Sequence, residues 1–271
     1  MKRNRFPTSN PKPSETATKA LALIVFGWML IATCRDVTAQ TVPQWSTKID
    51  LPLVPVAAAN LPNGKVLVWS ADSPLAFTPG EVNLRNHQND GGTYTAIFDP
   101  VAGTSTQVFV TNIGHDMFCP GIVNLPDGNI FVTGGSSSSK VSAFNPALGQ
   151  WAAQKQMKIP RAYHGSVTLS NGDVFVLGGS WNGGLGGKSG ETWNSRSGWK
   201  ENTAVTANWT ANSRDPDVTN DARGIYRADN HMWLFADSNG MVFHAGPSQA
   251  MQWIGTTGTG SMSTPVIRDR D

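Results

Sequence analysis

The sequence predicts an all-β protein built from repeated hairpins. Three segments share one pattern, in which an Asn-Gly or Asp-Gly dipeptide separates two apolar runs: Leu61–Ser70 (LPNGKVLVWS), Leu125–Gly135 (LPDGNIFVTGG) and Leu169–Gly179 (LSNGDVFVLGG). These dipeptides tolerate positive φ angles, so each segment is expected to form two strands joined by a two-residue type I′ turn. The 28 glycines, 17 prolines and 10 tryptophans also favour short strands over long helices.

A fourth, more divergent hairpin is predicted at Ala228–Ala236, with Asn230-His231 at its turn. Shorter strand pairs lie between the hairpins, so that two hairpins make one four-stranded unit. The turn glycines Gly128 and Gly172 are 44 residues apart. A unit of roughly 40–50 residues with a Gly-Gly doublet after its second strand is typical of a kelch-type β-propeller blade.

Residues 40–271 are therefore expected to form about four blades of a partial kelch-type β-propeller. A closed ring takes typically 4–8 blades. The last segment, Ser263–Asp271, contains no strand that could pair with the first blade and cover the open edges. The sequence thus predicts a domain truncated at its C-terminus, through a truncated gene, a partial reading frame or a decayed pseudogene.

Residues 1–39 are predicted to be a cleaved signal peptide. A basic leader precedes the uncharged run Ala20–Cys34, and the small-residue pattern Val37-Thr38-Ala39 follows it. A permanent membrane span needs about 20 apolar residues, so a retained anchor is the weaker alternative, as is lipidation at Cys34. Secretion to the periplasm or the extracellular space is expected.

Composition excludes several classes of protein. Only 15% of the residues are charged while 39% are hydrophobic, which argues against a disordered chain or a coiled coil. The formal net charge is +2, and the basic residues that gather in the leader leave no basic stripe in the rest of the chain. Nucleic acid is therefore not an expected partner.

Two side chains hold the same place in consecutive units. Cys119 lies nine residues before Gly128, and Tyr163 lies nine residues before Gly172, so both precede the first strand of their hairpin. In a propeller these strand starts gather at one mouth of the central channel. A two-residue turn at Asn171-Gly172 also places Tyr163 opposite Ser180, beside Trp181. Cys119, Tyr163 and Trp181 are expected to converge, although a buried thiol among packed aromatic rings would give the same pattern.

Several motifs resemble the galactose oxidase family of copper radical oxidases. They are His115–Gly121 (HDMFCPG), Arg161–Tyr163 (RAY) and Gly178–Gly184 (GGSWNGG), and the resemblance continues through Tyr226–His231 and Gly246–Ser248. It spans most of residues 55–260 and corresponds to about the first half of the family's seven-bladed catalytic domain.

The resemblance implies roles for five residues. Cys119 Sγ would join the ring of Tyr163 in a thioether, the Tyr163 oxygen would bind copper, and its ring would hold the radical. Trp181 would stack over the crosslink and take part in catalysis and substrate binding. Phe118 would back the crosslink, and Phe77 matches a phenylalanine of the substrate pocket.

The remaining copper ligands of the family, a second tyrosine and two histidines, have no counterpart in this sequence. His87, His115, His164, His231 and His244 fall in no matching motif and are predicted to be surface or hydrogen-bonding residues. The family's substrate-binding arginine is not assigned to Arg268 or Arg270, whose surroundings differ. One oxygen ligand cannot hold Cu²⁺ tightly. The chain alone is therefore expected to be inactive and to hold no copper tightly.

Two functions remain open at this stage. The complete parent is expected to be a monomeric oxidase that takes a primary alcohol, a sugar or an aldehyde with O₂ and releases hydrogen peroxide with an aldehyde or acid. The alternative is a secreted kelch-type propeller that binds carbohydrate or protein without catalysis.

Overall fold

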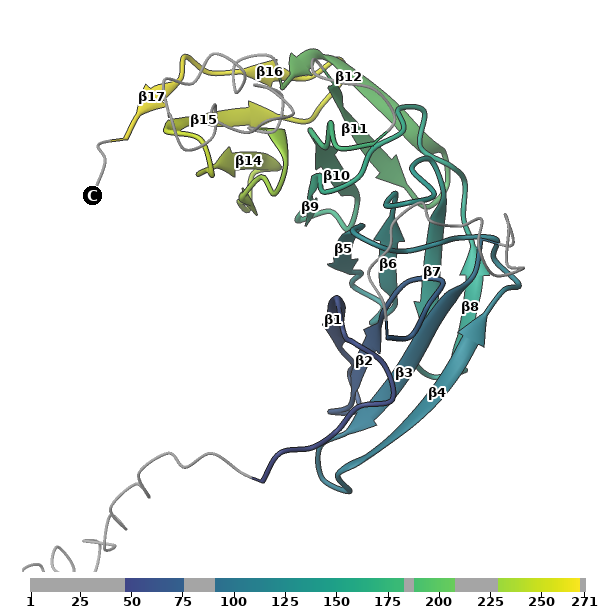
Figure 1. The fold of residues 1–271 in the computed structure, drawn as a ribbon. Helices are drawn as coiled ribbons and strands as arrows, with labels where there is room; N and C mark the ends of the chain where they lie inside the picture. Colours follow the sequence, from purple (N-terminus) through teal and green to yellow (C-terminus); the bar gives the residue numbers. More distant parts are fainter. Residues whose placement is uncertain (1–46, 76–90, 183–187, 208–228, 269–271) are drawn as a thin grey trace, which may run out of the picture. The chain divides into compact units, whose positions relative to one another are not determined.

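Four antiparallel sheets make up the structure, a computed structural model that describes residues 47–75, 91–182, 188–207 and 229–268 (Figure 1). All strands belong to one compact unit, Ile49–Asp271. These four ranges contain no α-helix, and hence no helix with the length and hydropathy of a membrane span. The predicted leader, residues 1–39, and Phe77 lie outside the described residues.

The strands follow one another in chain order within each sheet. The first sheet holds β1 (Ala57–Asn60), β2 (Val66–Trp69), β3 (Thr93–Asp99) and β4 (Thr104–Val110). The second holds β5 (Gly121–Asn124), β6 (Ile130–Thr133), β7 (Val141–Asn145) and β8 (Gln150–Ala153). The third holds β9 (Gly165–Thr168), β10 (Val174–Leu177), β11 (Ser189–Asn194) and β12 (Gly198–Thr206). The fourth holds β13 (Leu234–Ala236), β14 (Met241–His244), β15 (Ala250–Gly255) and β16 (Ser261–Met262), with β17 (Val266–Ile267) also paired to β15.

This arrangement confirms the predicted all-β fold of about four blade-like sheets (Figure 1). Each sheet is a meander of consecutive strands, which is the form of a propeller blade. The first strands lie side by side, since β9 contacts both β5 and β13. Side chains at the strand ends join them, because Asn124 Nδ2 donates to the Asn60 carbonyl (3.1 Å) and Thr168 Oγ1 donates to the Asn124 carbonyl (2.8 Å).

The predicted two-residue turns are wrong, because each of the three hairpins has a three-residue loop. In the third hairpin Leu169 N donates to the Asp173 carbonyl (2.8 Å) and Gly172 N donates to the Leu169 carbonyl (2.9 Å). Gly172 has φ +86°, whereas Asn171 is not in the left-handed region. A type I′ turn requires positive φ at both central residues, so the loop is instead a tight turn completed by one left-handed glycine.

The fourth hairpin is also displaced from its predicted position. β13 and β14 pair with Ala236 opposite Val242, and the turn between them runs from Asp237 to Gly240, which has φ +77°. His231 therefore lies before the first strand, not at the turn. Its distance to Gly240 is nine residues, the same spacing that separates Cys119 and Tyr163 from their turn glycines.

One apolar position in the second sheet and its equivalent in the third insert into the following sheet. Phe131 and Phe175, each three residues after a turn glycine, are fully buried. The Phe131 ring lies 4.4 Å from the Trp193 ring of the third sheet, and Phe175 packs in one cluster with Val242 and Ile254 of the fourth. Burial of these aromatic side chains away from water stabilises the packing of each sheet against the next.

The equivalent face of the fourth sheet is exposed. Phe243 holds the position of Phe131 and Phe175, and it pairs with Phe235 on β13 and Trp253 on β15. The Phe235 and Trp253 side chains are 59% and 43% exposed. Phe243, Phe235 and Trp253, which we call the aromatic row, therefore leave partly or fully exposed the surface that the preceding sheets bury, with Phe243 itself half-buried.

We expect the aromatic row to cause the chain to self-associate. A Trp253→Lys substitution should lower the weight-average molar mass measured by sedimentation at high protein concentration, because it removes apolar contact area and adds charge. Analytical ultracentrifugation over a concentration series would measure this. Leu148→Lys is the matched control, since Leu148 is an exposed apolar residue of the second sheet's loop; equal behaviour of the two variants would contradict the assignment.

Candidate active site

Three residues share a strained backbone conformation at the start of consecutive sheets. Cys119, Tyr163 and His231 have φ angles of 58°, 58° and 53°, and they are the non-glycine residues with positive φ in the part of the chain that the structure describes. The left-handed region is unfavourable for side chains with a Cβ, and such residues gather at functional sites. The three define what we call the left-handed ladder.

Backbone hydrogen bonds join the members of the ladder. Tyr163 N donates to the Cys119 carbonyl (3.0 Å), and His231 N donates to the Tyr163 carbonyl (2.6 Å). Cys119 and Tyr163 each stand two residues before their first strand, and His231 stands three residues before β13. Equivalent positions of three neighbouring sheets are thereby brought into register.

The Gly-Gly doublets make this close approach possible. A Cβ on Gly135 would collide with the Phe118 carbonyl oxygen, and one on Gly179 would collide with the Ala162 carbonyl oxygen. Both glycines also have positive φ, +104° and +87°. The doublets are therefore required where the loop after the second strand passes the ladder residues.

The side chains of Cys119, Tyr163 and Trp181 meet, as the sequence predicted. The ring centroids of Tyr163 and Trp181 lie 5.2 Å apart with the planes 68° from parallel, an edge-to-face contact. Burial raises the pKa of the Cys119 thiol to about 11, partly offset by its side-chain hydrogen bond with Tyr163 and increased by the nearby Asp116 carboxylate. A thiol with this pKa is protonated at neutral pH, which disfavours thiolate nucleophile chemistry.

The register used to place Trp181 was wrong by one residue. Ser180 bridges Ala162, in an isolated parallel contact, and not Tyr163. The antiparallel β9–β10 register has Gly165 opposite Leu177, which would place Tyr163 opposite Gly179 if it continued. The difference arises from the third residue in the hairpin loop, which shifts every pairing by one position. Tyr163 still contacts Trp181, because an aromatic side chain reaches a diagonal neighbour.

Of the other two predicted site residues, the structure describes Phe118, which lies next to Cys119 in the chain, but not Phe77. Phe118 is buried beside Cys119, its N–H donates to Asp116 Oδ1 (3.1 Å), and its carbonyl accepts from Ser136 N (2.9 Å). Phe77 lies outside the described residues.

Sequence reasoning missed the place of His231 in this cluster. Its imidazole centroid lies 4.7 Å from the Tyr163 ring centroid, with the planes 70° from parallel. The nine-residue spacing to Gly240 carries the signal, but the predicted turn at Asn230-His231 obscures it.

A buried ion pair fixes the segment that leads to Tyr163. Arg161 and Glu191 are both fully buried and their Nη2 and Oε2 atoms lie 2.9 Å apart. Arg161 also donates to the carbonyls of Gly178 and Ser189, both at 2.8 Å. Because every charged group is paired and hydrogen-bonded, this burial of charge is tolerated and ties the segment to β11.

Lys188 joins the Tyr163 segment to the loop that carries Trp181. Its ammonium donates to the carbonyls of Pro160 (2.8 Å), Gly179 (2.8 Å) and Asn182 (2.5 Å). The three N–H donors of the ammonium are thus paired with one carbonyl of the segment before Tyr163 and with two carbonyls that flank Trp181 in the chain. Burial lowers the pKa of Lys188 to about 8, with repulsion from Arg161 acting in the same direction and the Asp229 carboxylate opposing it.

Asp229 provides the corresponding link to the His231 segment. Its carboxylate accepts from Ser180 N (2.9 Å) and from Ser180 Oγ, and its carbonyl accepts from Gly179 N (2.9 Å). Burial raises the pKa of this carboxyl, while the Ser180 hydrogen bonds act against the rise. The loop carrying Trp181 is therefore fixed to the segments before both Tyr163 and His231.

Three further histidines, His115, His164 and His244, are buried in the interior. His115 is buried, with Nδ1 2.9 Å from Ser142 Oγ and Nε2 2.8 Å from the Gly134 carbonyl oxygen. His164 Nε2 lies 2.7 Å from Thr133 Oγ1. Burial lowers the pKa of His115 and of His244 to about 4, and lowers that of His164 well below its usual value. These histidines are buried in the neutral form, and the prediction that they are hydrogen-bonding residues agrees with their contacts.

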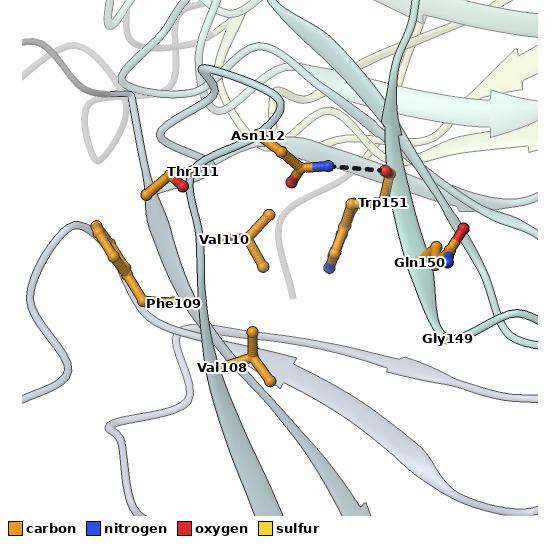
Figure 2. Close-up of a pocket in the computed structure, with 8 residues that line it drawn as sticks. All are labelled: Val108, Phe109, Val110, Thr111, Asn112, Gly149, Gln150 and Trp151. Carbon is orange, nitrogen blue, oxygen red and sulfur yellow. Dashed lines mark hydrogen bonds between the residues drawn. The ribbon is translucent and has the colours of Figure 1, made fainter.

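Away from this cluster, the described residues also form a groove of about 540 Å³ (Figure 2). It lies between β4 and β8 and is lined by Val108–Asn112 and Gly149–Trp151. Asn112 Nδ2 donates to the Trp151 carbonyl across it (3.3 Å), and the Trp151 side chain itself is buried. The lining has no acid, base or thiol, so this groove carries no group for a reaction.

Relatives of known function match most of the chain. A galactose oxidase from Gibberella zeae is 40% identical over 238 residues, which cover 84% of this chain and 32% of the relative, and a second galactose oxidase sequence from that species matches equally. A solved structure of a fungal alcohol oxidase of the AA5 family, in complex with copper, has a TM-score of 0.71 at 36% identity and covers 85% of this chain and 45% of that one. No protein-family model matches the chain. The chain spans about a third of the length of its curated relatives.

We expect Lys188→Met to destabilise the loop around Trp181. Methionine keeps the length of the side chain but leaves three carbonyls without their donor, so the free energy of unfolding should fall by about 3 kcal/mol. Urea denaturation would measure this, and hydrogen exchange should show faster exchange in residues 179–182. Lys200→Met, at an exposed position of β12, is the control, and an equal effect of both variants would exclude the proposed clamp.

We also expect stability to fall with acid through the buried histidines. Below the ordinary pKa of about 6.5 the unfolded chain takes up protons that folded His115 does not bind until about pH 4. The free energy of unfolding should therefore decrease as the pH falls through this window. In His115→Gln the decrease should be smaller by up to about 3 kcal/mol. Urea titrations between pH 7 and pH 4 would compare the two, and parallel curves would argue against this origin.

Proposed function

Because this chain is homologous to galactose oxidase over 84% of its length, we propose that it carries the tyrosine side of the active site of a secreted copper radical oxidase. The observation that supports this most directly is the Cys119 thiol hydrogen-bonded to Tyr163, whose ring contacts Trp181. Thiol, phenol and indole come together through the left-handed ladder and the loop that Lys188 holds.

The proposed reaction of the complete enzyme is the oxidation of a primary alcohol, a sugar or an aldehyde by O₂. Two electrons and two protons leave the substrate, and O₂ takes up both to give hydrogen peroxide. The alcohol substrate becomes an aldehyde, or an aldehyde substrate becomes an acid with the addition of water. The protonated thiol and the phenol suit one-electron chemistry better than nucleophilic catalysis.

The described residues fit copper in part. Cu²⁺ favours several nitrogen and oxygen donors in tetragonal geometry, and the Tyr163 phenol oxygen would be one of them. No group of three His, Cys, Asp or Glu side chains in the described ranges is arranged to hold a metal ion. We propose that the other donors come from outside the described residues and that this chain alone is inactive. A bound copper ion would supply a one-electron redox centre beside the phenol.

Within this proposal each side chain has a defined task. A thioether would form between Cys119 Sγ and the ring carbon beside the phenol carbon of Tyr163, as two hydrogens leave and O₂ accepts both electrons. The sulfur substituent donates electron density, so the crosslinked phenol would lose an electron more easily. Trp181 would shield the ring from water and contact the substrate. Phe118 would back Cys119, and Phe77 would line the substrate pocket.

The processing and state of the protein are part of the proposal. Residues 1–39 would be removed on export, residues 40–271 would form part of a kelch-type propeller, and the complete enzyme would be a secreted monomer. A non-catalytic carbohydrate- or protein-binding propeller is the second candidate. The groove of Figure 2 offers little for sugar binding, because the Trp151 side chain is buried and presents no aromatic face on which a sugar could stack.

A chimera tests the proposed role of Cys119 and Tyr163. We expect residues 40–271 fused to the remaining part of the Gibberella zeae galactose oxidase catalytic domain to form the thioether when copper and air are supplied. Peptide mapping should then find a linked Cys119–Tyr163 peptide that is lighter by two hydrogens. Cys119→Ala should lower the oxidase activity by orders of magnitude while the melting temperature changes little.

Matched variants separate crosslinking from shielding. In the chimera Trp181→Ala should still form the thioether but should lose the radical signal faster, because the ring is open to solvent. Residues 40–271 without the added part should form no crosslink under the same conditions. A free Cys119 thiol in an active, copper-loaded chimera would refute the assignment.

A further inference from the structure

We propose that His231 is a positioning residue that holds the Tyr163 ring in place, an inference that rests on the proposed role of Tyr163. The two rings meet edge to face, with their centroids 4.7 Å apart. His231 is thus a third side chain against the phenol, supplied by the fourth sheet, in addition to Cys119 and Trp181.

The backbone delivers this side chain with little freedom. His231 N donates to the Tyr163 carbonyl (2.6 Å), which fixes the left-handed residue directly to its target. On one side Asp229 is hydrogen-bonded to Ser180, and on the other Met232 is buried against Gly165 at the start of β9. Anchors on both sides hold the imidazole at Tyr163.

The contacts of Tyr163 come from three directions along the chain. Cys119 reaches it from the second sheet, Trp181 from the loop of its own sheet, and His231 from the segment before the fourth sheet. An aromatic ring that turns about its Cβ–Cγ axis must push such neighbours aside. The orientation of the ring plane decides whether one of the two equivalent carbons beside the phenol carbon faces the thiol, so a residue that limits this rotation positions the reacting carbon.

If His231 were only a surface residue, neither its left-handed backbone nor its contact with the Tyr163 ring would be accounted for. Residues with a Cβ are uncommon at φ +53°, the conformation that His231 holds, and histidine is one of the few that are found there more often. His231 is an exposed residue whose ring lies against Tyr163, whereas the ring of nearby Trp233, which is 49% exposed, contacts Arg268. The contact with Tyr163 is therefore specific to His231 among the exposed rings of this segment.

Ring rotation of Tyr163 tests the proposal in the chain itself. The protein contains three tyrosines, so incorporation of 3,5-difluorotyrosine gives few ¹⁹F signals, and Tyr163→Phe identifies the one that belongs to Tyr163. His231→Gly removes the ring and suits the left-handed backbone. We expect it to raise the flip rate of Tyr163 about three- to tenfold, as the loss of one edge-to-face contact implies. His231→Phe should restore the slow rate.

Controls separate this effect from a general loosening of the fold. Trp233→Gly is the matched control variant and should leave the flip rate of Tyr163 unchanged. The ¹⁹F signal of Tyr94, whose ring packs on Phe109 with the centroids 4.4 Å apart, should not change in any of the variants. If His231→Gly disturbs the Tyr94 signal, His231→Asn, which also tolerates positive φ, decides the question and should flip fast. An unchanged flip rate without the imidazole, or no rescue by phenylalanine, would overturn the proposal. The measurement needs neither copper nor turnover, so its failure is distinct from failure of crosslinking in the chimera.

Discussion

The left-handed backbone of Cys119, Tyr163 and His231 is the constraint on which the rest of the site depends. In an extended conformation these residues would continue the first strands, and alternation along the strand would send their side chains elsewhere. Positive φ instead turns the chain before each strand and lets the backbone groups of successive sheets bond to one another. Because the sheets repeat, the position before each first strand also repeats, and the side chains at these positions lie next to one another. The cluster can carry out chemistry because each sheet supplies a different residue at this position.

Such strain persists only where surrounding structure fixes it. Here the fixing groups are unusual for a β-sheet protein, since buried charges hold backbone carbonyls in the loops next to the ladder. Arg161 and Lys188 each bind main-chain carbonyls on more than one segment, and the Asp229 carboxylate accepts from the Ser180 N–H. Their desolvation is unfavourable, but a loop that must approach another backbone closely has no apolar side chain with which to pack. Charge-assisted hydrogen bonds are the strong interactions that remain available in that space.

Much of this arrangement could be predicted from the sequence, because the turn dipeptides mark each hairpin and a constant spacing of nine residues carries Cys119 and Tyr163 to equivalent positions. The loop length could not be predicted, since Asn-Gly suits both a two-residue turn and a three-residue loop that ends in a left-handed glycine. His231 was missed because its hairpin lacks the Asn-Gly signal, and the nearest asparagine, Asn230, suggested a turn in the wrong place. The buried role of Lys188 has no sequence signal, because a lysine is normally expected at the surface.

The ladder also bears on what a covalent bond between Cys119 and Tyr163 would do for the fold. The two residues are 44 positions apart and belong to adjacent sheets. A crosslink that closes a loop of this length restricts the unfolded chain, and the chain-entropy model gives about 4 kcal/mol of stabilisation. Because the Tyr163–Cys119 backbone hydrogen bond already aligns the two residues, little of this would be lost to strain in the folded state. The proposed thioether would therefore join the second and third sheets at the same point where it tunes the phenol, which links the stability of the fold to the maturation of its chemistry.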